Sequence, residues 1–297
     1  MFQSHIGEMA ALMTAVCWSF TSLSFEAAGK RVGSLPVNVI RLVLGFIFLS
    51  VFTFFVRGMI LPFDASAHVW IWLSLSGLVG FVIGDLFLFE AFVTAGARIS
   101  MLMMSFVPPI TALIGWIMLG ETLTWFEILA MAMTVCGVAL VVLERNADNR
   151  VTFSRPIKGI LYAFGGAVGQ AVGLILSKYG MGNYNAFAAT QIRIITGIVG
   201  FLLIFILFKR TKTLIPAVRN ATAMKLTALG AFFGPFLGVS LSLFSVQHTQ
   251  AGIASTIMAL PPILIIPLAI LLFREKVTER EFLGALIAVV GTALFFI

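Results

Sequence analysis

Long apolar runs separated by short polar connectors make up nearly the whole chain. A helix that crosses a bilayer core of about 30 Å needs about 20 apolar residues, and ten runs approach or exceed that length. They lie near residues 7–28, 36–56, 69–95, 98–119, 124–143, 157–178, 186–208, 224–247, 250–273 and 278–297. Unbroken apolarity, as in residues 198–208, excludes the alternating strands of a membrane β-barrel. The pattern predicts an all-α integral membrane protein with ten transmembrane helices.

The second half of the chain repeats the first. A shift of 152 residues superposes Ile40-Arg41 on Ile192-Arg193, and a shift of 154 residues then superposes Gly84 on Gly238. Further matches at the second offset are Met104 with Met258, Pro108 with Pro262, Glu121 with Glu275 and Gly137 with Gly291. We therefore predict two five-helix repeats, residues 1–143 and 157–297, joined by a polar linker over residues 144–156. Because five is odd, the second repeat must be inverted, an arrangement typical of secondary transporters that work by alternating access.

Composition agrees with a membrane protein, since 60% of the 297 residues are apolar and 10% are charged, against about 25% charged in soluble domains. A soluble enzyme and a nucleic-acid binder are excluded, and the net charge of +7 reflects cations in connectors. One set of alternate connectors carries fifteen Lys and Arg residues, whereas the other carries two, Arg57 and Lys178. The positive-inside rule then predicts a multi-pass protein of a bacterial-type inner membrane, with a cytoplasmic linker and both termini in the periplasm.

Two acids lie inside the third run, and intramembrane ionisable groups are candidates for function. Asp85 and Glu90 are five residues apart, which places them about 140° apart around a helix. They therefore do not share one narrow face. Either acid could couple transport to protons, and either could equally be a structural pair or a neutral, hydrogen-bonded group.

Charged residues also lie near the ends of the first two helices of each repeat. Glu26 and Arg41 should lie at similar depth and form a structural ion pair. The equivalent positions of the second repeat are Lys178 and Arg193, so two cations share one depth without an acid. They need an anion, which could be Glu121, a lipid headgroup or a substrate carboxylate, unless they extend to the membrane surface.

Other polar residues in the spans are candidates for the substrate pathway. Trp18 and Gln170 occupy equivalent positions, and paired positions of inverted halves often face one central cavity. We place Gln191, Arg193 and Lys178 on the same pathway.

Glycines and prolines mark contact faces and bends. Glycines at 165, 169 and 173, and again at 230, 234 and 238, predict smooth faces for close helix contact. Prolines interrupt the fourth and ninth runs and could act as hinges or be static kinks; they are Pro108, Pro109, Pro261 and Pro262.

These features together resemble the drug/metabolite transporter superfamily, specifically its EamA-type ten-helix members. The resemblance rests on Trp18-Ser19, on an Arg fifteen residues beyond a charged position in each repeat, and on two related helix ends, residues 119–124 and 273–278. It covers essentially the whole chain. It implies a protein that exports or exchanges small metabolites, amino acids or drugs without ATP.

Signals of an enzyme are absent from the sequence. His5, His68 and His248 are too scattered for a metal site, and neither a phosphate-binding GxxxxGK[ST] loop nor a GxSxG elbow occurs. We therefore expect no catalytic residues, metal, cofactor or nucleic-acid partner. The sequence favours a secondary active transporter that moves a small metabolite, such as an amino acid or a related and even anionic compound, across the inner membrane. Export coupled to protons or exchange is the main hypothesis; an uncoupled facilitator or an intramembrane lipid-modifying enzyme are the alternatives.

Overall fold

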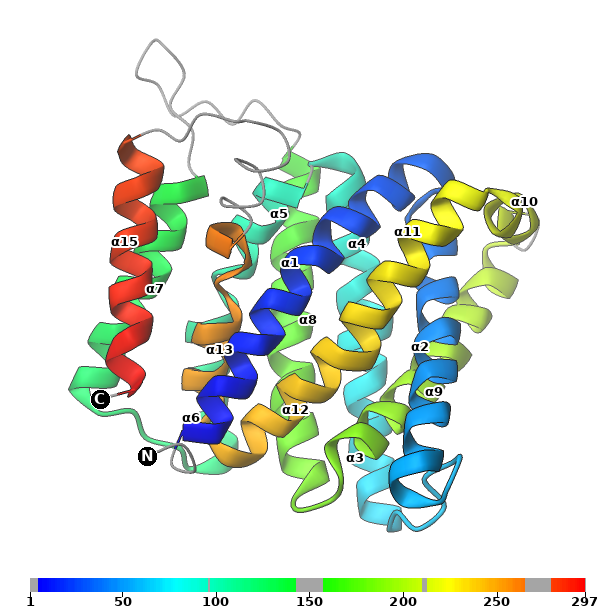
Figure 1. Ribbon diagram of the computed structural model, residues 1–297, viewed down its shortest axis with the longest axis horizontal. Coiled ribbons are helices and arrows are strands. Elements are labelled where there is room, and N and C mark those ends of the chain that lie inside the picture. Colours follow the sequence, from blue (N-terminus) through cyan, green and yellow to red (C-terminus); the bar gives the residue numbers. More distant parts are fainter. Residues whose placement is uncertain (1–4, 96, 143–156, 210–212, 265–278, 297) are drawn as a thin grey trace.

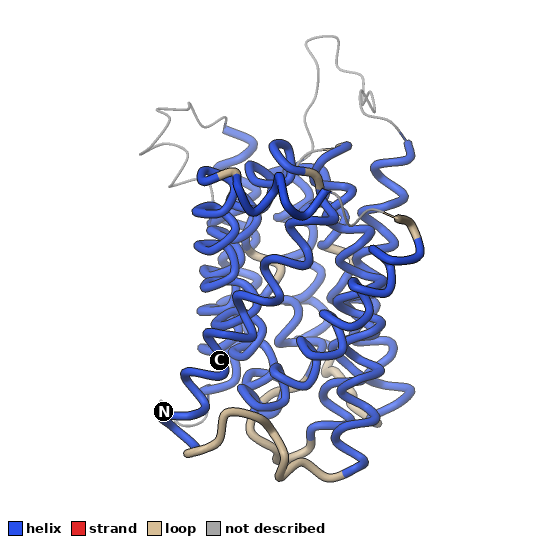
Figure 2. Tube along the Cα trace, turned by 90° about the vertical axis from the view of Figure 1, so that its right-hand side faces the viewer, coloured by secondary structure: helices blue, strands red, loops and turns tan. Residues whose placement is uncertain are grey.

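Helices make up the described part of the computed structural model, and no strand occurs within it. The residues described are 5–95, 97–142, 157–209, 213–264 and 279–296. Within these ranges, six helices are long and apolar enough to cross a membrane, and four shorter apolar helices accompany them. These ten helices coincide with the ten predicted runs. They run side by side along the molecule (Figure 2). The all-α, ten-span prediction is confirmed, whereas the linker 144–156 and the helix end at 273–278 lie outside the described residues.

The repeats show the same succession of helices. The first contains α1 (Ile6–Val32), α2 (Ser34–Arg57), α3 (Ala67–Gly77), η2 (Leu78–Gly84), α4 (Asp85–Thr94), α5 (Ala97–Met104), α6 (Val107–Leu119) and α7 (Trp125–Val142). The second contains α8 (Ile157–Met181), α9 (Ala186–Leu207), α10 (Leu214–Arg219), α11 (Ala221–Ala231), η4 (Phe232–Gly238), α12 (Val239–His248), α13 (Ala251–Met258), α15 (Glu279–Ala293) and η5 (Leu294–Phe296). From α11 to α13, every boundary equals that of its counterpart in α3 to α5 shifted by 154 residues. The short α10 is not predicted from sequence because its six residues are too few for a span and lie in the connector between two predicted runs.

Local signals place several helix ends. The side chains of Asn185 and Asn220 accept hydrogen bonds from backbone N–H groups in the first turns of α9 and α11, as N-cap residues do. Gly58 and Gly120 end α2 and α6 with φ of +70° and +66°, a conformation that glycine adopts without steric cost.

A π-helical segment interrupts the third span of each repeat at the same register, as η2 and η4. Such wide turns are rare in proteins overall, and many of those that occur lie at functional sites. In η4 the segment contains Pro235, which has no N–H to donate and therefore breaks the α-helical hydrogen-bond ladder. In η2 it ends at Gly84, directly before Asp85. The wide turn thus sets the rotation of the helix at the point where a buried acid follows.

Each repeat packs mainly against the other. The first helices, α1 and α8, lie on the third spans of the opposite repeats, α2 packs on α9, and α7 packs on α15. Figure 1 shows α7 and α15 side by side at one edge of the molecule and both termini at the same end. Placement of the termini at one end agrees with an even number of spans.

The predicted glycine faces are confirmed by the contacts of the helices. A Cβ at Gly169 would lie 2.6 Å from the Cα of Gly84, and one at Gly173 would lie 2.9 Å from the Cα of Gly80. At the equivalent crossing in the second repeat, Gly234 meets Thr21 and Gly238 meets Trp18. The third span of each repeat therefore approaches the first helix of the other repeat closely.

The prolines stand where spans begin again after a break. α5 ends at Met104, and Pro108 and Pro109 lie in the first turn of α6, where the missing N–H costs no helical bond. Similarly, α13 ends at Met258, and Pro261 and Pro262 open the helical stretch that continues to Leu264. The breaks are a feature of the structure, and a hinge role for the prolines stays a prediction.

Candidate functional site

A cavity of about 120 Å³ lies between the two repeats and is lined by side chains from both. Most of its lining is apolar, including Phe25, Phe81, Phe89, Met104 and Met258. The polar lining residues are Trp18, Thr21, Ser22, Arg41, Asp85, Gln170, Arg193, Ser242 and Ser255. A concave, mainly apolar site with a few convergent polar groups is the usual form of a small-molecule site.

The lining follows the sequence repeat. Nine pairs of equivalent positions contribute both members to the cavity. At the offset of 152 residues these are Trp18 with Gln170, Ser22 with Leu174 and Arg41 with Arg193. At the offset of 154 residues they are Phe81 with Pro235, Asp85 with Val239, Leu88 with Ser242, Met101 with Ser255, Met104 with Met258 and Val107 with Pro261. The cavity therefore lies where the two repeats are related by pseudo-symmetry.

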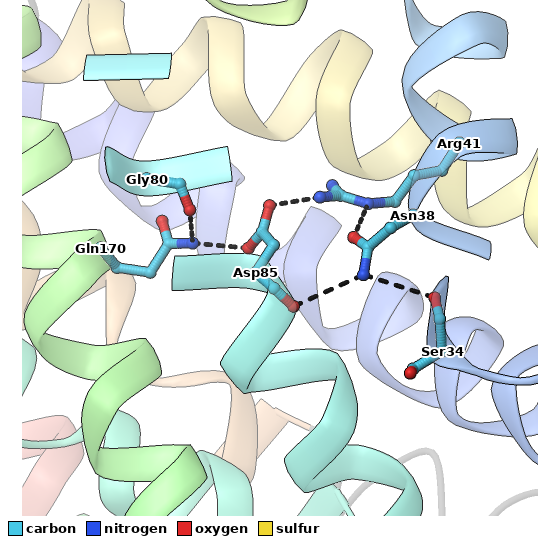
Figure 3. Close-up of polar contacts among 6 residues, drawn as sticks. All are labelled: Ser34, Asn38, Arg41, Gly80, Asp85 and Gln170. Carbon is cyan, nitrogen blue, oxygen red and sulfur yellow. Dashed lines mark hydrogen bonds and ion pairs between the residues drawn. The ribbon is translucent and has the colours of Figure 1, made fainter. Parts of the chain in front are cut away.

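Asp85 is the centre of a polar network in this cavity (Figure 3). Its Oδ2 forms an ion pair with Nη2 of Arg41, and its Oδ1 accepts a hydrogen bond of 2.6 Å from Nε2 of Gln170. Asn38 supports the arrangement, since its Oδ1 accepts from Nε of Arg41 at 3.0 Å and its Nδ2 donates to the backbone oxygens of Asp85 and Ser34. Both oxygens of Asp85 are therefore engaged, one by each repeat.

The glycine contact described above brings Gln170 within reach of Asp85. Because Gly169 and Gly84 meet without side chains, the backbones of α8 and the third span lie close together. Gln170, the next residue after Gly169, then reaches the carboxylate, and its amide also lies 3.4 Å from the carbonyl oxygen of Gly80. Glycine at these positions is what allows the two repeats to share one buried acid.

Arg193 is the second cation of the cavity and is arranged differently from Arg41. Both arginines are buried, with exposed fractions of 3% and 4%. The guanidinium of Arg193 lies over the Phe81 ring at 4.7 Å from its centroid, and that of Arg41 lies 5.7 Å from the same centroid. Nε of Arg193 has no hydrogen-bond partner in the described part of the chain. The Phe81 ring thus lies close to two like charges, of which that of Arg41 has Asp85 as its partner.

Four residues predicted for the pathway or for coupling are brought together here, namely Trp18, Gln170, Arg193 and Asp85. The predicted ion pair between Glu26 and Arg41 is wrong. Arg41 pairs with Asp85, and Glu26 instead binds Nζ of Lys30 at 2.5 Å. Arg41 is buried against the third span, where Asp85 is within reach of its guanidinium. Glu26 and Lys30 are one turn apart on α1 and therefore pair with each other.

The structure places two residues predicted for the substrate pathway, Lys178 and Gln191, outside the cavity lining. Nζ of Lys178 lies 2.5 Å from Oε1 of Glu121, so Glu121 is the anion that this cation requires. Gln191 donates to Oγ of Ser50 and to the backbone oxygen of Ile60, at 2.9 and 2.6 Å. These two residues therefore tie helices and connectors together rather than line the cavity.

Glu90 is also outside the cavity lining and accepts a hydrogen bond of 2.7 Å from the Ser34 hydroxyl at the start of α2. The expectation that Asp85 and Glu90 occupy different faces is confirmed. Of the two acids, Asp85 alone is among the residues that line the cavity.

Asn38 and the lining residue Phe81 are two residues of the site that were not singled out from sequence. Asn38 supports Arg41, and the Phe81 ring lies close to the guanidinium groups of both arginines. The repeat gave no direct signal for Phe81, because its equivalent position is Pro235.

A second polar cluster joins the repeats at the end of the molecule that holds the termini. Lys178 donates to the backbone oxygen of Thr249 at 2.6 Å, and the Thr249 hydroxyl donates to Glu8 at 2.8 Å. Glu121 accepts from the backbone N–H of Ala251 at 2.8 Å. Because Glu8 and Glu121 belong to the first repeat and the others to the second, this cluster holds the repeats together at that end.

A third cluster connects the loops that follow α2 and α8. Asp64 binds Nη2 of Arg57 at 2.5 Å and accepts a hydrogen bond of 2.9 Å from the Tyr184 hydroxyl. Burial alone would raise the pKa of the Asp64 carboxyl, but the Tyr184 hydroxyl and the Arg57 guanidinium lower it below its usual value. Burial raises the pKa of the Tyr184 hydroxyl above its ordinary value. The contact therefore favours an ionised Asp64 and a neutral Tyr184.

An all-helical, multi-pass chain with a central cavity shared by two inverted repeats has the architecture of a membrane transporter. The EamA-like transporter family matches residues 5–143 and 157–297, and the chain belongs to this family, within the drug/metabolite transporter superfamily. Membership of a transporter family agrees with the expectation that the chain is not an enzyme.

Individual proteins are also similar to this chain. An "Uncharacterized transporter" of Clostridium kluyveri is 22% identical over 182 residues, which are 60% of this chain. The chain spans 57% of the length of that relative. A solved structure described as "Crystal structure of protein" superposes with a TM-score of 0.74 at 17% identity, over 97% of this chain and 96% of the other. This second likeness concerns the fold.

Proposed function

We propose that the protein is a secondary active transporter that carries a small metabolite, such as an amino acid or a related compound, through the central cavity. The main support is that equivalent positions of the two repeats line one cavity. In this cavity Asp85 is bound by Arg41 of the first repeat and by Gln170 of the second. Inverted repeats that exchange conformations around a site at their interface give alternating access. The cluster of Lys178, Glu121 and Thr249 supports the same proposal, because opening the cavity at that end would require its contacts to break.

We further propose that Asp85 couples transport to protons. A proton on Asp85 would weaken its ion pair with Arg41 and its hydrogen bond from Gln170, and these contacts lie at the junction of the repeats. Exchange of substrate for substrate is the other form of coupling compatible with this site. We place the protein in the inner membrane of a bacterial-type cell, surrounded by lipid, with export as its direction.

The test compares two carboxyl groups of the same span. Asp85→Asn should fold and still exchange substrate at equal pH on both sides of proteoliposomes, but should lose uptake driven by a pH gradient. Glu90→Gln removes a carboxyl group five residues away that lies outside the cavity lining, and should retain pH-driven uptake. Equal pH-driven uptake by Asp85→Asn and the native protein would remove Asp85 from coupling. Transport by the native protein that never responds to a pH gradient would favour an uncoupled facilitator.

A further inference from the structure

The ionisable side chains that line the cavity are Arg41, Asp85 and Arg193, which together carry one net positive charge. We propose that, among the amino acids and related compounds considered above, this cavity selects a monocarboxylate that has an apolar body and lacks the ammonium group of an amino acid, and that Arg193 holds its carboxylate. The inference rests on the proposed transport function, since it names the class of substrate for the same cavity.

Arg193, rather than Arg41, is the free cation. Arg41 is held by Asp85 and Asn38. Arg193 lies over the Phe81 ring, and its Nε has no hydrogen-bond partner in the residues that the structure describes. Asp85 is the acid whose charge acts on Arg193, but its two oxygens are already taken by Arg41 and Gln170. A buried charge that lacks a hydrogen-bonded counter-charge is strongly unfavourable, and a bound anion would supply one.

A carboxylate fits this cation better than other anions do. One guanidinium presents two parallel N–H donors that match the two oxygens of a carboxylate. A phosphate ester, with a charge of about −1.5 to −2 at pH 7, would require a second free cation. Arg41 is the other cation of the described lining, and it is already paired with Asp85.

The rest of the lining favours an apolar body and disfavours an ammonium group. Phe25, Leu88, Phe92, Met104 and Met258 are among the side chains around the cavity. An ammonium group would have to compete with Arg41 and Gln170 for the oxygens of Asp85, close to two guanidinium groups. A zwitterion would also leave the positive charge of the cavity uncompensated, whereas a monocarboxylate neutralises it.

A first experiment uses the native protein and a set of probes with one carbon skeleton. The probes are 4-methylpentanoate, 4-methylpentanamide, 4-methylpentylamine and leucine, repeated with 3-phenylpropanoate, its amide, its amine and phenylalanine. Thermal unfolding of the detergent-purified protein reports binding, since a ligand stabilises the folded state by mass action. The acids should raise the unfolding temperature most, and amides, amines and amino acids should do less. Stronger stabilisation by the amino acid or the amine, or no stabilisation by either acid, would overturn the proposal.

A second experiment tests Arg193 itself. Arg193→Gln should weaken binding of the acid by roughly 10- to 100-fold, the usual contribution of a hydrogen-bonded charge, and should leave binding of the amide unchanged. Arg193→Lys keeps the charge and should retain part of the affinity. As a control for overall charge, Lys225→Gln removes a cation from the exposed face of α11 and should have no effect. Equal losses for acid and amide in Arg193→Gln would make Arg193 architectural and would overturn the proposal.

Gly80 offers a variant that moves Arg193 without removing it. A Cβ at Gly80 would lie 2.9 Å from Nη2 of Arg193, the end of a flexible side chain that can shift. Gly80→Ala should therefore lower affinity for the acid, by less than Arg193→Gln does, and spare the amide. Unchanged acid affinity in this variant would contradict the placement of the carboxylate at Arg193.

These measurements separate the substrate class from the proposed function. Acid binding without transport in proteoliposomes would refute the transport proposal and leave the binding site standing. Transport of a different class of compound, with no binding of the acids, would leave transport standing and refute the assignment of a monocarboxylate.

Discussion

At the scale of single residues, buried charges are the most informative feature of this protein. Arg41, Asp85 and Arg193 are each at least 96% buried, by their exposed fractions of 4%, 4% and 3%, in a chain that spans a membrane. Groups of this kind are retained in spans chiefly for function. Both oxygens of Asp85 are bound, one from each repeat, whereas Nε of Arg193 has no hydrogen-bond partner in the described residues. The proposals above therefore give Asp85 the coupling role and Arg193 the role of binding substrate.

A surface carboxyl group provides a test by pH. Because the folded pKa of Asp64 is lower than its unfolded pKa, its contribution to stability is fully present above the unfolded value, about 3.9, and is lost as the pH falls through the folded value. Asp64→Asn should therefore lower the unfolding temperature near neutral pH, by about 1 to 3 °C for so exposed a pair. The difference from the native protein should shrink below about pH 4.

Tyr184→Phe is the matched control, since it removes the hydroxyl that donates to Asp64 and keeps the ring. Its effect should follow the same pH dependence and be smaller, because Arg57 still binds Asp64. A difference between the native protein and Asp64→Asn that stays constant down to pH 3 would show that the carboxylate does not stabilise this contact.

At the scale of helices, the decisive feature is the contact between α8 and the third span of the first repeat. Gly169→Ala places a Cβ 2.6 Å from the Cα of Gly84, and backbone cannot move aside as a side chain can. We expect a loss of about 1–3 kcal/mol of unfolding free energy, as for overpacked cores. The same displacement should draw Gln170 away from Asp85.

Gly165→Ala is the control on the same glycine row, because the atom nearest to its Cβ would be in the Phe87 side chain, 3.1 Å away. A change of less than about 1 kcal/mol is expected there, since alanine favours the helix and the ring can shift. Denaturation of both variants in detergent measures the difference. If both variants lost a similar amount of unfolding free energy, the backbone contact at Gly169 would not be what makes a glycine necessary there.

The sequence sufficed for the helices and for part of the site. Hydropathy located the spans, and the repeat located Trp18 with Gln170 because equivalent positions keep equivalent surroundings. The partner of Arg41 could not be predicted, because the choice between Glu26 and Asp85 depends on how α2 is rotated against the third span. That rotation depends in turn on the π-helical turn η2, for which hydropathy gives no signal. Glu121 was one of three anions considered for Lys178, and the choice among them could not be made from sequence because Glu121 comes from a distant connector.

At the scale of the whole molecule, the testable feature is the orientation of the chain in the membrane. The uneven distribution of Lys and Arg predicts that both termini are periplasmic and that the linker 144–156 is cytoplasmic. A reporter that is active only in the cytoplasm should be inactive when fused after Ile297 and active when inserted in the linker. A reporter in the connector between α2 and α3 should also be inactive. The opposite pattern would reverse the orientation and leave the repeat intact.

The position of Trp18 has a practical consequence for observing such a molecule at work. The chain has five tryptophans, and Trp18 is the one among the cavity lining residues. Trp116 and Trp125, by contrast, are exposed on the outside of the bundle, by 60% and 87%. Indole emission shifts to longer wavelength as its surroundings become more polar. With Trp70, Trp72, Trp116 and Trp125 replaced by Phe, the remaining fluorescence would report the entry of water or ligand into the cavity, without any attached dye.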